Sequence, residues 1–383
     1  MSRVSKLMER AMTVVSLDKF GEDSFREGLE ILVASADSEA RFSEVGSASF
    51  DSQIVNYLSC RLQVEDWYAR HPDIDDQEIV APLIGLGLPR TGSTALSCLL
   101  AEDPSARFIR NWEAVAPCPP PQSETEHSDP RIDLARQALA RRDTLFPRMK
   151  SMVPSTATGP TECQTVMAYD FKSQLFQAFA RVPTYVAWLN YTADLVPTYR
   201  YVKRVLKLLQ WRCPPTRWRL KNPSHSMFIS ALAEVFPDAR FWMTQRDITS
   251  VLPSVCDLYF ELCKAYSHDV DKRFLARQNE EWTELGLRRV IAFRDTGQDH
   301  RFFDIHYAPF QKDPFPALEQ LYDFLGEDLT DTARTRMQAW RNNTPRDKHG
   351  THAYNPADFG IDLDRLRERF RFYMDRFDVL QAA

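Results

Sequence analysis

Hydrophobic and polar positions divide the chain into short apolar runs, which predict strands, and amphipathic stretches, which predict helices. Residues 78–87 (EIVAPLIGLG) are almost wholly apolar, as expected of a buried strand in a parallel sheet. Similar short runs predict four further strands, at 107–110, 217–221, 240–245 and 301–306. Helical spacing follows at 93–102, 224–236 and 248–266. Strands that alternate with helices predict a parallel sheet covered on both faces.

The remaining parts of the chain are predicted to be helical additions to this sheet. Residues 1–75 form an N-terminal helical layer, and residues 145–215 form a helical insertion rich in aromatic side chains. Helices are also expected at 271–294 and 364–378. There is no internal repeat or low-complexity linker, so the sequence predicts one α/β domain over residues 1–383.

Composition and charge narrow the class of protein. Hydrophobic residues make up 44% and charged residues 26%, which is typical of a globular chain. A net charge of −5 argues against general nucleic-acid binding. No apolar run reaches the ~18 residues that span a bilayer. The first ten residues lack the apolar stretch of a signal peptide, and the seven cysteines form no CxxC pair. We therefore expect a cytoplasmic protein with reduced thiols.

A glycine-rich turn is the first candidate site. Gly87–Thr94 (GLPRTGST) lies between the clearest strand and a helix, where backbone N–H groups converge on one point and suit a phosphate. The G-x4-G spacing is that of a P-loop, but Ser93 stands where an ATP-binding loop has lysine, and the nearby cation is Arg90. This disfavours nucleoside triphosphate hydrolysis. A plain strand-to-helix turn is the alternative interpretation.

The segments LGLPRTGSTAL and RNWEAVAPCPPP resemble the phosphosulfate loop of bacterial sulfotransferases that use 3′-phosphoadenosine 5′-phosphosulfate (PAPS). The resemblance implies a three-layer, P-loop-like α/β fold. It also implies that the 5′ end of the donor is bound by the residues of this loop: Arg90, Thr91, Gly92, Ser93 and Thr94.

Further motifs match the same family along most of the chain, including RLKNPSH, VFPDARF and THAYNPADFGID. Members of the family bind the donor's 3′-phosphate with an arginine at a strand end and a serine eight residues later. The resemblance implies that Arg246 and Ser254 have this role here. An arginine fork and a hydroxyl at a helix start suit a phosphate. Tyr307 matches the tyrosine that contacts the adenine in this family, although Ala308 stands where the family usually has glutamate. Lys348 weakly matches a loop of the family that lies late in the sequence and binds the 3′-phosphate.

Sulfuryl transfer requires a base for the acceptor and positive charge for the leaving oxygen, and it needs no metal. Arg90 and Lys221 are the candidates for the leaving group. Glu113 is favoured narrowly as the base, with His225 as the alternative base or an acceptor ligand. Glu162 is a further candidate for the acceptor pocket. His349 and His352 form an H-x-x-H pair without a third metal ligand nearby.

The predicted function is therefore a sulfotransferase acting on a small, apolar hydroxyl acceptor, with the insertion at 145–215 on the acceptor side. Two alternatives stay open: a P-loop kinase-like phosphotransferase, and a non-catalytic nucleotide-binding regulatory protein. The sequence does not identify the acceptor, and it leaves both a monomer and a homodimer open.

Overall fold

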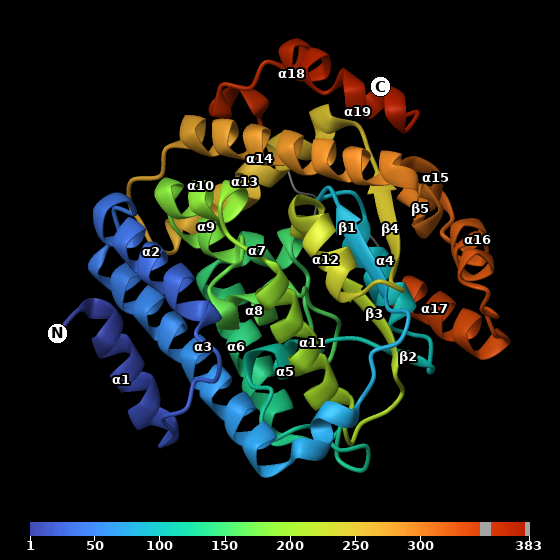
Figure 1. Cartoon of the computed structure of the whole chain (residues 1–383). Coiled ribbons are helices and arrows are strands. Elements are labelled where there is room, and N and C mark those ends of the chain that lie inside the picture. Colours follow the sequence, from blue (N-terminus) through green and yellow to red (C-terminus); the bar gives the residue numbers. More distant parts are fainter. Residues whose placement is uncertain (345–353, 380–383) are drawn as a thin grey trace.

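In the part of the chain that the structure describes, a central parallel sheet of five strands organises the fold (Figure 1). The structure is a computed structural model that describes residues 1–344 and 354–379. The strands lie in the order β2-β3-β1-β4-β5, and every neighbouring pair is parallel. Their bounds are Leu83–Gly87 for β1, Ala106–Arg107 for β2, Arg217–Lys221 for β3, Arg240–Gln245 for β4 and Phe302–His306 for β5.

Side chains of the strands alternate between two hydrophobic cores, one on each face of the sheet. Leu83 and Trp242 pack with α4 (Ser93–Leu100), α16 (Phe315–Leu325) and α17 (Asp331–Asn343). Ile84 and Phe241, one position along each strand, face the larger core on the other side. A side chain at Gly85 would collide with the Trp242 ring, so glycine is required there. This period-two pattern is the reason that helices cover both faces.

The larger core is covered by helices from several parts of the chain. They include α12 (Ile229–Val235), the 3₁₀ helix η3 (Pro223–Phe228), α13 (Ile248–Lys264) and α14 (Lys272–Phe293). The N-terminal helices lie on the side of the molecule away from α16 and α17 (Figure 1). Their bounds are Arg3–Val15 for α1, Ser24–Glu39 for α2 and Glu44–Arg70 for α3.

The connection between β2 and β3 carries a series of helices that are 4 to 16 residues long. They are α5 (Asn111–Val115), α6 (Pro130–Leu145), α7 (Pro147–Met152), α8 (Gln164–Met167), α9 (Leu175–Phe179), α10 (Pro183–Tyr191) and α11 (Val196–Gln210). After β5 the chain forms α15 (Tyr307–Lys312) and ends its described part with α18 (Leu363–Arg369) and α19 (Arg371–Arg376).

The predicted fold class is confirmed, and the differences lie at the ends of elements. The strands at 217–221 and 240–245 have the predicted bounds. The first strand begins only at Leu83, because Ala81 has a left-handed φ of 41° and Pro82 has no N–H to donate. The region 162–210 is divided into separate helices, two of which start with a proline in their first turn. The assignment of residues 1–383 to one domain stays a prediction.

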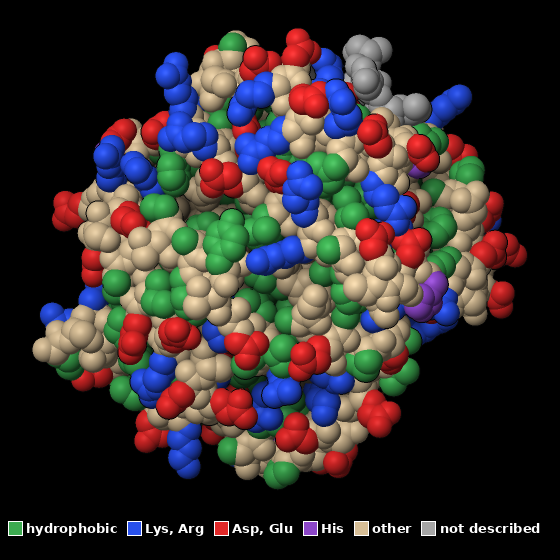
Figure 2. Space-filling model, turned by 45° about the horizontal axis from the view of Figure 1, so that its top comes forward, with side chains coloured by type: hydrophobic (Ala, Val, Ile, Leu, Met, Phe, Trp, Pro, Cys, Tyr) green, Lys and Arg blue, Asp and Glu red, His purple; other side chains and the backbone are tan. Residues whose placement is uncertain are grey.

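The surface does not gather charge of one sign on the face shown in Figure 2, where acidic and basic side chains are interspersed. Over residues 1–344 and 354–379, no helix combines the length and apolar character needed to cross a bilayer. All seven cysteines lie in these ranges and are free thiols.

Candidate active site

The glycine-rich turn joins the carboxyl end of β1 to the start of α4, as the sequence predicts. Three of its residues have positive φ, with values of 106° at Gly87, 62° at Arg90 and 85° at Gly92. The buried Thr91 hydroxyl donates to the carbonyl of Leu88 at 2.7 Å and also bonds the hydroxyl of Thr244 on β4. Thr91 therefore fixes the shape of the turn, and its backbone N–H remains the group that can face a phosphate.

The next two predicted residues begin the helix that follows the turn. Ser93 is the first residue of α4 and is buried, whereas Thr94 is exposed. The N–H groups of the first turn of a helix lack partners within that helix, so they are available to an anion. The structure thus places Ser93 and Thr94 at the helix end that faces the turn.

The two halves of the predicted donor site meet directly. Arg90 Nε donates to Ser254 Oγ at 3.0 Å, and Arg90 Nη1 donates to the carbonyl of Met152. Arg246 Nη1 donates to the carbonyl oxygen of Arg90 at 2.6 Å. Residues that are 164 and 156 positions apart in the chain are therefore in contact around one spot.

Tyr307, the first residue of α15 directly after β5, completes this cluster. The Arg246 guanidinium carbon lies 4.2 Å from the centre of the Tyr307 ring, a cation–π contact. A Cβ atom added to Gly92 would lie 3.2 Å from the same ring. Glycine at position 92 therefore serves two purposes, because it permits the left-handed turn and leaves space beside the tyrosine.

The electrostatics of the cluster favour an anion. In the described part of the chain, the polar partners of Arg90 and Arg246 are a hydroxyl and two carbonyl oxygens, with no carboxylate among them. Burial and, next, the positive charge of Arg246 lower the pKa of Arg90. The nearby Asp257 offsets this effect on Arg90 in part, but among the described residues no carboxylate is hydrogen-bonded to either guanidinium, and a bound phosphate would relieve the repulsion between them.

Lys221 ends β3, beside the strand that carries the glycine-rich turn. Its ammonium forms an ion pair with Glu162, and only 6% of the lysine side chain is exposed. The backbone N–H of Asn222 donates to the carbonyl of Gly85 at 2.9 Å. Lys221 therefore lies at the carboxyl edge of the sheet, where parallel α/β proteins bind their ligands.

Glu113 is buried inside a network of arginines. Its carboxylate accepts hydrogen bonds from Arg107 at 2.7 and 3.1 Å, and from the Arg110 side chain and backbone N–H at 3.1 and 3.0 Å. The side chain has no exposed surface. A general base needs an oxygen open to the acceptor, so these contacts weigh against that role. The assignment of Glu113 as the base stays a prediction.

His225 lies in η3 and is also enclosed, with 1% of its surface exposed. Its Nδ1 is 2.9 Å from the Tyr199 hydroxyl, while Nε2 has no hydrogen-bond partner. Burial lowers the pKa of His225 to about 3, so the ring is neutral at physiological pH. Its role as a base or an acceptor ligand likewise stays a prediction. Lys348 and the pair His349 and His352 lie outside the described residues.

Three contributors to the site were not found from the sequence: the carbonyl of Met152, the hydroxyl of Thr244 and the hydroxyl of Tyr373. Tyr373 on α19 bridges the backbone of Arg246, accepting from its N–H and donating to its carbonyl, each at 3.2 Å. A carbonyl leaves no sequence signal, and neither hydroxyl stands in a recognisable motif. Tyr373 holds the strand end from which Arg246 projects.

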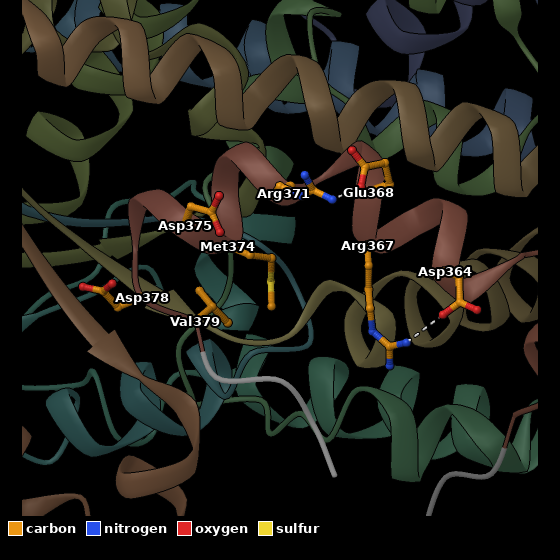
Figure 3. Close-up of a pocket in the computed structure, with 8 residues that line it drawn as sticks. All are labelled: Asp364, Arg367, Glu368, Arg371, Met374, Asp375, Asp378 and Val379. Atoms are coloured by element: carbon orange, nitrogen blue, oxygen red, sulfur yellow. Dashed lines mark hydrogen bonds and ion pairs between the residues drawn. The ribbon is translucent and has the colours of Figure 1, made fainter.

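A cavity of about 550 Å³ lies beside the C-terminal helices and contains none of the predicted site residues (Figure 3). Its arginines are neutralised locally, since Arg367 pairs with Asp364 at 3.0 Å and Arg371 pairs with Glu368. Within the described ranges, no three His, Cys, Asp or Glu side chains gather as a metal site requires.

A parallel sheet whose strand ends and strand-to-helix turn direct two arginines toward one point has the arrangement of an anion-binding α/β protein. The model of the sulfotransferase family matches residues 82–331. The chain belongs to the sulfotransferase family, a family of enzymes, and the predicted family is confirmed.

Solved structures and curated proteins agree with this. The sulfotransferase STF9 from Mycobacterium avium has a TM-score of 0.92 at 32% identity, covering 99% of this chain and 98% of that one. STF1 from Mycobacterium tuberculosis H37Rv has a TM-score of 0.86 at 29% identity, covering 96% and 98%. The omega-hydroxy-beta-dihydromenaquinone-9 sulfotransferase Stf3 of Mycobacterium bovis is 30% identical over 113 residues. That match spans only 28% of either chain.

Proposed function

We propose that this protein transfers the sulfuryl group of PAPS to the hydroxyl group of a small, apolar acceptor. The observation that carries the proposal is the hydrogen bond from the Arg246 guanidinium to the Arg90 carbonyl, in a part of the described chain where no carboxylate is hydrogen-bonded to either arginine side chain. PAPS carries a 5′-phosphosulfate and a 3′-phosphate, so it presents an anion to each arginine.

In this proposal the donor lies along the carboxyl edge of the sheet. The turn from Arg90 to Thr94 holds the 5′-phosphosulfate through backbone N–H groups and the α4 terminus. Arg246 and Ser254 bind the 3′-phosphate, Tyr307 meets the adenine, and Lys348 belongs to the 3′-phosphate side. Lys221 and Arg90 neutralise the oxygen that leaves sulfur. Negative charge forms on this oxygen in the transition state, and fixed cations beside it lower the activation barrier.

The acceptor is proposed to enter beside the helices of residues 145–215. Their aromatic side chains suit an apolar alcohol or phenol. Stf3 is named for a hydroxylated menaquinone derivative, which is also apolar with a hydroxyl group, and this supports the same acceptor class. We further propose a cytoplasmic location. A homodimer is a proposal that light scattering of the purified protein would test.

Two measurements test the proposed function. Adenosine 3′,5′-bisphosphate, the desulfonated donor, should raise the melting temperature without added magnesium, and ATP should raise it far less because it lacks the 3′-phosphate. Transfer of ³⁵S from labelled PAPS to a panel of apolar alcohols and phenols should then identify the acceptor class. Equal shifts by the two nucleotides, or a shift by ATP that requires magnesium, would favour the kinase-like alternative instead. Donor binding without transfer to any acceptor would favour a regulatory protein.

A further inference from the structure

The Lys221–Glu162 ion pair lies at the carboxyl end of β3, beside the strand that carries the glycine-rich turn. One carboxylate oxygen of Glu162 accepts from Lys221 Nζ, and the other accepts from Gln164 Nε2 at 2.5 Å. The backbone is tied as well, because the N–H of Cys163 donates to the carbonyl of Lys221 at 3.0 Å. Glu162 is therefore held at the end of β3 by both its side chain and the following residue.

Two observations place this carboxylate near the strand that leads into the glycine-rich turn and near α13. Lys221 pairs in register with Gly85, two residues before the turn begins. The charge of Glu162 also reaches α13, where it adds to burial in raising the pKa of Tyr259, five residues beyond Ser254. Glu162 is thus placed beside the same edge of the sheet as the arginine cluster.

Accessibility separates Glu162 from the two predicted bases. Glu113 has no exposed side-chain surface and His225 is 1% exposed, whereas 27% of the Glu162 side chain is exposed. An acceptor hydroxyl can reach Glu162 without breaking a buried network. The partner of Glu162 is a lysine, a flexible cation whose ammonium can turn toward another anion nearby.

We propose that Glu162 is the general base of the reaction and that Lys221 exchanges Glu162 for the departing oxygen during transfer. The proposal rests on the proposed function. The acceptor O–H bond breaks and its proton passes to Glu162, while the acceptor oxygen forms a bond to sulfur. The bond from sulfur to the bridging oxygen breaks, and its electron pair stays on the 5′-phosphate. Lys221 remains an ammonium and faces this new charge. Glu162, whose side chain is partly exposed, then returns the proton to water.

The Lys221–Glu162 pair explains how Lys221 can have an anionic partner both when the donor is absent and when it is bound. Without donor, Glu162 neutralises a lysine that would otherwise be a buried, unpaired cation, which is costly. With donor bound, the phosphosulfate supplies the negative charge instead. Glu162 is released from its strongest partner at the moment when the acceptor needs a base.

The test compares Glu162→Gln with Glu162→Asp and with a matched control, Glu327→Gln. Glu327 pairs with Arg217 at the opposite end of β3 and with Arg219 in the middle of that strand, outside the proposed site. Donor binding is measured by calorimetry with adenosine 3′,5′-bisphosphate, and turnover with labelled PAPS and a series of phenols of decreasing pKa.

We expect Glu162→Gln to lower kcat by about 10²–10⁴-fold, within the range of general-base catalysis, with the dissociation constant of the bisphosphate changed less than about threefold. The deficit should shrink for acidic phenols, which are already ionised, a trend that a structural role would not produce. Glu162→Asp should recover part of kcat, and Glu327→Gln should match the wild type.

Three results would overturn the assignment: turnover near wild type in Glu162→Gln, loss of bisphosphate binding in that variant, or an equal deficit for all phenols. Failure of the proposed function is recognised separately, because then the wild type itself neither binds the bisphosphate nor transfers ³⁵S.

Discussion

Arg246 donates from Nη1 to the carbonyl oxygen of Arg90 at 2.6 Å, which links the end of β4 to the middle of the glycine-rich turn. This hydrogen bond places the Arg246 guanidinium against the turn that carries Arg90. A donor with two anionic groups would give each guanidinium its own charge-assisted hydrogen bonds, the stronger class in proteins, with the 3′-phosphate at Arg246. The relationship between these two residues therefore makes the 3′-phosphate of the nucleotide the first feature to test.

Arg246→Ala should weaken binding of adenosine 3′,5′-bisphosphate by about 2–4 kcal/mol, the cost of removing one partner from a charged hydrogen-bonded pair. Binding of adenosine 5′-phosphate, which lacks the 3′-phosphate, should change little. The ratio of the two dissociation constants, measured by calorimetry, is thus large in the wild type and near one in the variant. The control is Arg334→Ala, which removes an arginine of α17 that pairs with Glu319 on α16. A variant that loses affinity for both nucleotides equally would contradict the assignment of Arg246 to the 3′-phosphate.

Tyr373→Phe should reduce both stability and donor affinity. The hydroxyl of Tyr373 accepts from the N–H and donates to the carbonyl of Arg246, so its removal leaves two backbone groups of the strand end without this partner. We expect a loss of about 1–3 kcal/mol in the free energy of unfolding, measured by urea titration. The fall in bisphosphate affinity should be smaller than that of Arg246→Ala, because the guanidinium is still present. Unchanged donor affinity in a destabilised variant would show that Tyr373 does not position Arg246.

The sequence anticipates that Arg90, Arg246 and Ser254 come together, as the structure shows, but not the surroundings of Glu113 and Glu162. Arg246 follows the end of β4 and Ser254 lies eight residues later in α13, so the chain itself brings both to one edge of the sheet, where each contacts Arg90. The parallel sheet brought the turn at Gly87 beside them, since carboxyl ends of neighbouring strands share one edge. Glu162 and Lys221 are 59 positions apart, and their pairing depends on how the insertion folds back on β3. The arginines that enclose Glu113 include a strand residue, Arg107, whose direction no spacing rule reveals.

His225 should make stability depend on pH. Its pKa is about 3 in the folded protein and about 6.5 in an unfolded chain, because burial disfavours the charged ring. The unfolded state therefore takes up a proton as the pH falls through about 6.5 and the folded state does not. The contribution is fully present above pH 6.5 and is lost toward pH 3, by at most about 1.4 kcal/mol per pH unit.

Urea unfolding at pH 7.5, 6.0 and 5.0 measures this dependence. His225→Gln should show a flatter fall in stability than the wild type, and His127→Gln, at a side chain that is 89% exposed, should follow the wild type. Parallel curves for all three proteins would show that His225 is protonated in the folded state. If His225 were also the base, the acid limb of kcat would lie near pH 3 rather than near 6.5.

Glu113→Gln should act mainly on folding. The carboxylate receives four hydrogen bonds from Arg107 and Arg110 inside the protein, and an amide replaces one of its oxygens with an N–H₂ group that faces guanidinium donors. Breaking a buried ion pair in this way costs about 3–5 kcal/mol. We therefore expect a large drop in melting temperature. Glu126→Gln, which removes the other carboxylate paired with Arg110 at a side chain that is 15% exposed, should cost less and is the matched control.

The opposite outcome would restore Glu113 as the base. In that case Glu113→Gln would melt near the wild-type temperature and bind adenosine 3′,5′-bisphosphate normally, yet lose about 10²–10⁴ of its turnover. The deficit would also shrink with acidic phenols. Because Glu162→Gln is expected to give that same pattern, measuring both variants on one phenol series decides between the two carboxylates. The base is the residue whose replacement by glutamine lowers turnover strongly with weakly acidic phenols and only slightly with phenols that are already ionised.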